Sequence, residues 1–120
     1  MDNNCIHKVH NIFRAVVEFE RALETKFEMN INELMLLCML ANNESLLAGE
    51  IANEMGLSRS NASKVIAALE RKGYLERHAC KNDSRCQRCS ITKEGLEQME
   101  HINCDSFPPP PNLAAYIVVP

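Results

Sequence analysis

Residues 48–73 read AGEIANEMGLSRSNASKVIAALERKG, which has the pattern of two short helices joined by a tight turn. Gly56 ends the first helix, because a residue without a Cβ readily adopts the left-handed conformation that closes a helix. Ser58 is a good N-cap for the second helix, which Gly73 stops. The small side chain of Ala52 lets the two helices cross closely. This stretch therefore predicts a helix-turn-helix.

The periodicity of the sequence changes directly after these helices. Residues 74–78 and 87–91 are short extended stretches around a polar connection at 81–85, which predicts a β-hairpin with a basic tip. Thr92 is the expected N-cap of a further helix that runs to the neighbourhood of Cys104. A hairpin placed here makes the fold a mainly α-helical winged helix-turn-helix with a small β-hairpin wing.

Two more helices are expected before this motif. Apolar residues between Ile6 and Leu23 recur at helical spacing, which predicts an amphipathic helix of about 20 residues, long enough to pack partly against another subunit. Asn32 is the expected N-cap of the next helix, which ends near residues 42–43. The residues predicted to mark that helix as largely buried are Leu34, Leu37, Cys38 and Ala41.

The C-terminal part differs in composition from the rest. We expect a domain at residues 1–104, with helical dimerisation elements, and a Pro-rich, apolar tail at residues 105–120. Four consecutive prolines end the preceding helix, because Pro cannot donate the helical hydrogen bond. The apolar end of the tail either docks on a neighbouring surface or is a loose extension.

The composition of the 120 residues fits one domain, with 46% hydrophobic and 24% charged residues. The longest uninterrupted apolar run, at residues 34–41, is far shorter than the roughly 20 residues of a membrane span. Residues 1–15 lack the pattern of a signal peptide. We therefore expect a cytoplasmic protein without a membrane partner, whose six cysteines are reduced by default.

The net charge of −3 is unevenly distributed along the chain. Residues 58–93 contain nine Lys or Arg and three acidic residues, a local balance of +6, so the remaining residues carry −9. Such asymmetry indicates that a polyanion meets the basic segment, although a solvated basic face without a ligand is the alternative.

Several segments share their order and register with a known family. They are Glu50-Ile51-Ala52, residues 56–60 (GLSRS), residues 69–77 (LERKGYLER), and above all Asp83-Ser84-Arg85 followed by Ile91-Thr92-Lys93-Glu94-Gly95. Over roughly residues 5–104 the chain closely resembles the MarR family of bacterial transcription regulators. The resemblance implies a homodimer that binds a pseudo-palindromic operator as a repressor, released by a small-molecule inducer or by cysteine oxidation. Relatives generally have another long helix where this chain has residues 107–120, which leaves the dimer geometry and the ligand pocket open.

The resemblance implies that the second helix of the motif enters the major groove. There Ser60, Asn61 and Lys64 are predicted to reach bases, while Ser58 and Arg59 hold phosphates or guanines. In the wing, Asp83 is expected to orient Arg85 for a narrow, A·T-rich minor groove; alternatively this pair only stabilises the turn. The full set of predicted DNA contacts is Ser58, Arg59, Ser60, Asn61, Ser63, Lys64, Lys81, Asp83, Arg85 and Arg88.

The cysteines allow other interpretations. Zinc-ligand side chains lie within 12 residues at His78, Cys80, Cys86 and Cys89. Strand alternation directs Cys89 away from the face of Cys86, so we predict no metal site and no cofactor. A reversible Cys80–Cys86 link stays open, since cross-strand neighbours can meet disulfide geometry. Cys5 lies roughly where peroxide-sensing relatives have a reactive cysteine.

The leading prediction is a dimeric, sequence-specific DNA-binding transcriptional regulator, acting as a repressor. The second is a metal- or redox-sensing winged-helix regulator that uses its wing cysteines, and the third is an interaction protein of the same fold that does not bind DNA. An enzyme is not expected, because the sequence has no Gly-rich phosphate loop, HExxH or nucleophile motif. The expected partners are double-stranded DNA, a second copy of the chain and a small-molecule inducer.

Overall fold

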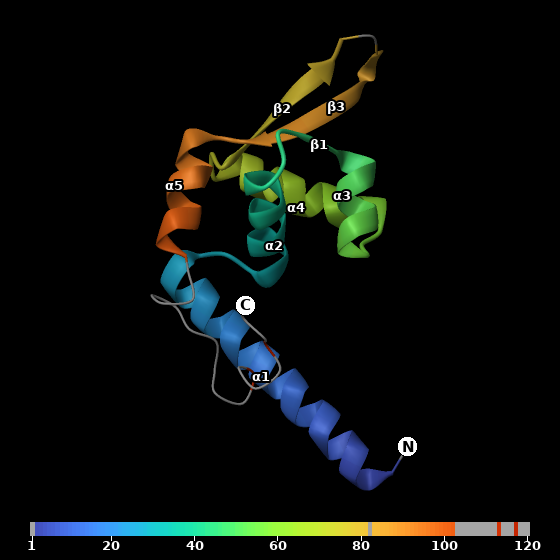
Figure 1. Cartoon of the computed structure of the whole chain (residues 1–120), viewed down its shortest axis with the longest axis vertical. Coiled ribbons are helices and arrows are strands. Elements are labelled where there is room, and N and C mark those ends of the chain that lie inside the picture. The colour runs from blue at the N-terminus through green and yellow to red at the C-terminus, as the bar shows by residue number, and fades with distance from the viewer. Residues whose placement is uncertain (1, 82, 103–112, 114–116, 118–120) are drawn as a thin grey trace. The chain divides into compact units, whose positions relative to one another are not determined.

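The computed structural model describes residues 2–81, 83–102, 113 and 117, but not the side chains of residues 83 and 84. The helices and strands follow the order α1 (Asn3–Phe27), α2 (Ile31–Ala41), β1 (Leu46–Leu47), α3 (Ala48–Met55), α4 (Arg59–Arg71), β2 (Leu75–Cys80), β3 (Asp83–Ile91) and α5 (Lys93–His101) (Figure 1). This is the predicted winged helix-turn-helix, mainly α-helical with a small antiparallel sheet. Apart from residues 113 and 117, the predicted tail at 105–120 lies outside the described residues.

One compact unit spans Ile31–Ile102, and helix α1 belongs to a second unit. Helix α1 has 25 residues, somewhat more than predicted, and the carboxylate of Asp2 caps it by accepting from the Cys5 N–H at 2.7 Å. Three side chains of its predicted apolar stripe are largely exposed: Ile6 (50%), Val9 (55%) and Phe13 (62%). In the described part of the chain, no helix combines the length and apolar character that crossing a membrane requires.

The helix-turn-helix of α3 and α4 forms as predicted. Gly56 has φ +65°, in the left-handed region that favours glycine, and the Leu57 N–H donates to the carbonyl of Ala52 at 2.9 Å. The Ser58 hydroxyl caps α4 by accepting from the Asn61 N–H at 3.1 Å. The four residues that α4 buries are Ala62, Val65, Ile66 and Leu69.

Helix α2 differs from the prediction in its cap and in its buried face. Asn32 is not an N-cap, because the helix already begins at Ile31. Of the residues expected to be buried, Leu37 is buried, but Leu34 and Cys38 are only half-buried and Ala41 is exposed. The four side chains that α2 buries are Glu33, Leu36, Leu37 and Leu40. They recur at a spacing of three to four residues and so form one helical face, slightly rotated from the predicted one.

Burial of Glu33 is possible because a lysine from another helix meets it. The Glu33 side chain is 5% exposed, and its Oε2 lies 2.9 Å from Nζ of Lys72, the C-cap residue of α4. A buried carboxylate is costly unless it is paired. The ion pair therefore joins α2 to the C-terminal end of the helix that carries most of the predicted DNA contacts.

The sheet has the order β1-β3-β2, with both pairings antiparallel. Strands β2 and β3 form the predicted hairpin, with register running from Leu75↔Ile91 to Ala79↔Gln87. Strand β1 was not predicted, since two residues, Leu46 and Leu47, carry no detectable alternation. It pairs with Cys89 and Arg88 and so fastens the start of α3 to the wing.

The base of the wing closes around Thr92. Its N–H donates to the carbonyl of Tyr74 at 3.0 Å, and its hydroxyl donates to the carbonyl of Gly73 at 2.6 Å. The same hydroxyl accepts from the Gly95 N–H at 3.0 Å, which makes Thr92 the N-cap of α5, as predicted. A Cβ on Gly95 would lie 2.5 Å from the Tyr74 carbonyl oxygen and 2.7 Å from Ile91 Cγ1. Packing at this junction thus explains why a Thr is followed, three residues later, by Gly.

Gly95→Ala should therefore destabilise the domain. The added methyl meets backbone, which cannot move aside as a flexible side chain can, so we expect the free energy of unfolding to fall by about 1–3 kcal/mol. Chemical denaturation followed by circular dichroism measures this change.

Gly49→Ala is the matched control, because nothing lies within 4 Å of a Cβ at this helical position. Alanine there should stabilise the protein by about 0.5 kcal/mol. Equal stability of the Gly95→Ala variant and the wild type would contradict the close approach at the wing base.

Candidate nucleic-acid interface

Helix α4 presents two chemically different faces. Its apolar face is buried, while the cap and the first two turns expose six predicted DNA contacts: Ser58, Arg59, Ser60, Asn61, Ser63 and Lys64. The oxygen of Ser58 accepts the Asn61 N–H, but the hydroxyl hydrogen can still donate outward. The exposed end of α4 is thus a row of hydrogen-bond donors with two positive charges.

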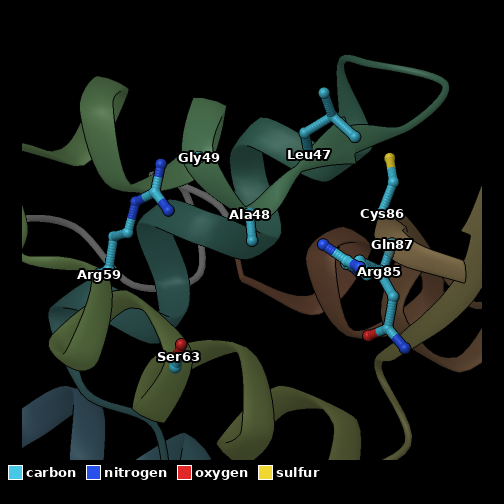
Figure 2. Close-up of a pocket in the computed structure, with 8 residues that line it drawn as sticks. All are labelled: Leu47, Ala48, Gly49, Arg59, Ser63, Arg85, Cys86 and Gln87. Atoms are coloured by element: carbon cyan, nitrogen blue, oxygen red, sulfur yellow. The ribbon is translucent and has the colours of Figure 1, made fainter. Parts of the chain in front are cut away.

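A cleft of about 380 Å³ lies beside this face. Its lining side chains come from the start of α3, from α4 and from β3: Leu47, Ala48, Gly49, Arg59, Ser63, Arg85, Cys86 and Gln87. Figure 2 shows Arg59 and Ser63 on one side and Arg85, Cys86 and Gln87 on the other. Two guanidinium groups separated by 26 positions in the sequence therefore line one cleft.

Four residues of this cleft carry no sequence signal for the site. Residues 47–49 and Gln87 line it, yet none was predicted to be part of the site. Their position depends on the pairing of β1 with β3, which brings the start of α3 to the wing. The weak signal of a two-residue strand could not reveal this arrangement.

The other predicted wing residues occupy different positions. Lys81 is exposed after β2, and Arg85 is exposed in β3. Arg88 is also exposed, and its Nη1 donates to the Ser45 hydroxyl at 3.1 Å, so this side chain connects β3 to the segment before β1. Asp83 begins β3, but its side chain is outside the described part of the structure, and its pairing with Arg85 stays a prediction.

Some positive charge of the basic segment is used inside the domain. Lys72 pairs with Glu33, and Nε of Arg77 lies 3.3 Å from Oε1 of Glu70. Both acidic partners offset the charge locally, so these two cations contribute less to the outer field. The remaining charge is concentrated at the start of α4 and along the wing.

The wing cysteines fall into two environments. Cys80 and Cys86 form a disulfide with their Cα atoms 5.3 Å apart, the link that the sequence left open. Cys89 is buried, and this burial raises the pKa of its thiol, although the charge of Arg77 partly opposes the shift. His78 instead contacts Ser90 at 3.1 Å and Glu76 at 3.4 Å.

Two further cysteines lie apart from the wing, and both are free thiols. Cys5 is exposed near the start of α1, and Cys38 is half-buried in α2. Within residues 2–81 and 83–102, no three His, Cys, Asp or Glu side chains gather into a group able to hold a metal ion. The zinc candidates His78, Cys80, Cys86 and Cys89 therefore do not form one such group, although Cys80 and Cys86 are bonded to each other.

Comparison with known sequences identifies relatives of this domain. A model described as MarR family matches residues 29–87. The chain is similar to the transcriptional repressor MprA of Escherichia coli strain K12, with 30% identity over 76 residues, 60% of this chain and 43% of that protein. It is also similar to the HTH-type transcriptional regulator PapX of Escherichia coli, with 29% identity over 94 residues, 77% of this chain and 55% of that protein. The chain spans about half the length of these curated relatives.

Solved structures share the fold. Sco3205, a MarR family transcriptional regulator from Streptomyces coelicolor in complex with DNA, has a TM-score of 0.72 and 28% identity, covering 77% of this chain and 61% of that chain. Wild-type MarR from Escherichia coli in its apo form has a TM-score of 0.71 over 97% of this chain and 82% of that chain, with 15% identity, which is a likeness of fold alone.

The relatives are transcription regulators, which are not enzymes, in agreement with the prediction. Because the MarR family model matches the helix-turn-helix and the first part of the wing, and a MarR family regulator solved with DNA shares the fold at 28% identity, the chain belongs to the MarR family of winged helix-turn-helix transcription regulators.

Proposed function

We propose that this chain is a sequence-specific DNA-binding regulator that acts as a homodimeric repressor. The observation that carries the proposal is the cleft that Arg59 of α4 and Arg85 of the wing both line, beside an exposed row of donors. Double-stranded DNA fits such a surface, because α4 can enter the major groove while the wing follows the sugar-phosphate backbone into the adjacent minor groove. The solved DNA complex of Sco3205 supports the same assignment for the fold.

In this proposal, α4 reads the major groove. Ser60, Asn61 and Lys64 contact base edges, and Arg59 holds a phosphate or a guanine. The Ser58 hydroxyl, which caps the helix through its oxygen, donates its hydrogen to a phosphate. Ser63, on the wall of the cleft, adds a further donor between helix and wing.

The wing supplies charge to the minor groove. Arg85 enters a narrow, A·T-rich stretch, where the negative potential is enhanced, and Asp83 orients its guanidinium. Lys81 neutralises a phosphate near the tip. Arg88 lies closer to the base of the wing and contacts DNA less directly, because its guanidinium holds the Ser45 hydroxyl.

A second copy of the chain is the proposed protein partner. The exposed apolar side chains of α1 at Ile6, Val9 and Phe13 are the proposed interface, and pairing would remove them from water. A two-fold dimer would present two α4 helices to successive major grooves, so the operator would be pseudo-palindromic with half-sites about 10 base pairs apart, or a multiple. Such a regulator would act in the cytoplasm, and a small-molecule inducer would release it from DNA.

Arg85→Ala should weaken binding to a duplex selected by the wild-type protein from a random-sequence pool. We expect a loss of about 1–3 kcal/mol and a salt dependence reduced by about one phosphate contact. Fluorescence anisotropy titrations at several salt concentrations measure both quantities.

Arg71→Ala removes the same charge from the last turn of α4, outside the cleft, and serves as the control. It should change affinity much less. Equal affinities and equal salt slopes for Arg85→Ala and the wild type would refute the role of the wing.

Asn61→Ala should relax sequence preference more than it weakens nonspecific binding, because its amide contacts base edges. The cap of α4 stays intact, since only the backbone N–H of residue 61 takes part in it. The measurement compares affinities for the selected duplex and for a scrambled duplex of the same composition. A parallel loss on both duplexes would show that Asn61 does not read sequence.

Phe13→Glu should dissociate the dimer, because it places a charge in the proposed apolar interface. Sedimentation at graded protein concentrations gives the association constant. Asn11→Glu, at another exposed position of α1, introduces the same charge and should leave the dimer intact. An unchanged association constant for Phe13→Glu would place the interface elsewhere.

A further inference from the structure

A disulfide closes the tip of the wing. Cys80 is the last residue of β2, and its partner Cys86 lies in β3. The bond encloses residues 81–85, which include two proposed DNA contacts, Lys81 and Arg85. A covalent constraint therefore lies directly beside the positive charge of the wing.

The hydrogen-bonded pairing of β2 with β3 is irregular at the tip of the wing. The register is regular up to Ala79↔Gln87 and then shifts, so that Cys80 faces Asp83. The lower part of the wing is held by different means, namely the pairing of β3 with both neighbours and the burial of Leu75 and Cys89. Opening the disulfide would thus loosen the tip while the base of the wing keeps its structure.

The disulfide can be reached from the DNA side of the domain. Cys86 lines the same cleft as Arg59 and Arg85 (Figure 2), and both bonded cysteines are only half-buried. Cys89 is a poor competitor for thiol chemistry, because it is buried and its pKa is raised. Chemistry at Cys86 would therefore act on the wall of the proposed DNA site.

We propose that the Cys80–Cys86 pair is a thiol–disulfide exchange site whose redox state regulates DNA binding, with a low-molecular-weight thiol as the reductant. This inference rests on the proposed function. A thiolate of the small thiol attacks Sγ of Cys86, forms a mixed disulfide, and releases Cys80, which takes up a proton. A second small thiolate then attacks the mixed disulfide, releasing Cys86 as a thiol and a symmetrical disulfide of the small molecule. Two small thiols are oxidised, and the protein disulfide gains two electrons and two protons.

The disulfide form is the tighter DNA binder. It holds residues 81–85 in a closed loop, so less conformational freedom is lost when Lys81 and Arg85 meet the phosphates. In the dithiol form, ordering these long side chains on binding should lower affinity roughly threefold to tenfold. The disulfide and dithiol forms carry the same net charge, so the salt dependence of DNA binding should be nearly the same for both.

The test uses the full chain and a fluorescent duplex selected from a random-sequence pool by the oxidised protein. Affinity is measured by anisotropy in glutathione buffers of graded thiol-to-disulfide ratio, and alkylation with mass spectrometry gives the fraction of Cys80–Cys86 disulfide in the same samples. Cys80→Ser/Cys86→Ser should bind like the reduced wild type at every ratio. The control, Cys5→Ser, removes an exposed thiol on α1 and should keep the full response.

The expected result is an affinity that follows the disulfide fraction in the wild type and in Cys5→Ser. Equal binding by the oxidised and reduced wild type would overturn the regulatory role while leaving the proposed function intact. A response that persists in the double serine variant, or a Cys80–Cys86 bond that forms at no ratio, would also overturn it. If no duplex is enriched and neither redox form binds DNA, the proposed function fails, and this inference fails with it.

Discussion

The contact between the backbone of residues 73–74 and Thr92, through its N–H and its hydroxyl, determines where the wing leaves the helix-turn-helix. Two hydrogen bonds at 3.0 and 2.6 Å join the carbonyls of Tyr74 and Gly73 to Thr92, at the two ends of the hairpin. The approach is so close that position 95 has no room for a Cβ. Because β2 begins and β3 ends at this junction, the position of Arg85 relative to α4, and therefore the cleft, depends on these contacts.

The ion pair between Glu33 and Lys72 lies next to this junction, at the C-terminal end of α4. Lys72 is the residue that ends α4, directly before the turn into β2, and Glu33 belongs to a helix whose other buried residues are leucines. The pair fixes the C-terminal end of α4 against α2, while the apolar face of α4 packs along its length. With the C-terminal end of α4 held in this way, its exposed N-terminal turns have a defined direction, which the proposed reading of DNA sequence requires.

The distribution of charge along this protein matters more than its net charge. The chain is acidic overall, yet its cations gather in the segment that forms α4 and the wing. Lys72 and Arg77 pair with carboxylates inside the domain, and Arg59 and Arg85 line the cleft. The proposed DNA partner would therefore be attracted to this segment and repelled by the acidic remainder of the chain.

Local signals in the sequence determined the elements around the proposed site, and longer-range contacts decided how they meet. Gly56, Ser58 and Thr92 act on their own backbone within a few residues, so the helix-turn-helix, the hairpin and the start of α5 were predictable from sequence alone. The buried face of α2 was misjudged, because burial of Glu33 depends on Lys72, which is 39 positions away. Strand β1, the bond from Arg88 to Ser45 and the placement of Arg59 and Arg85 on one cleft likewise have no local signature. Tertiary structure alone decided these features, since each arises from groups that become neighbours only when the strands pair and the helices pack.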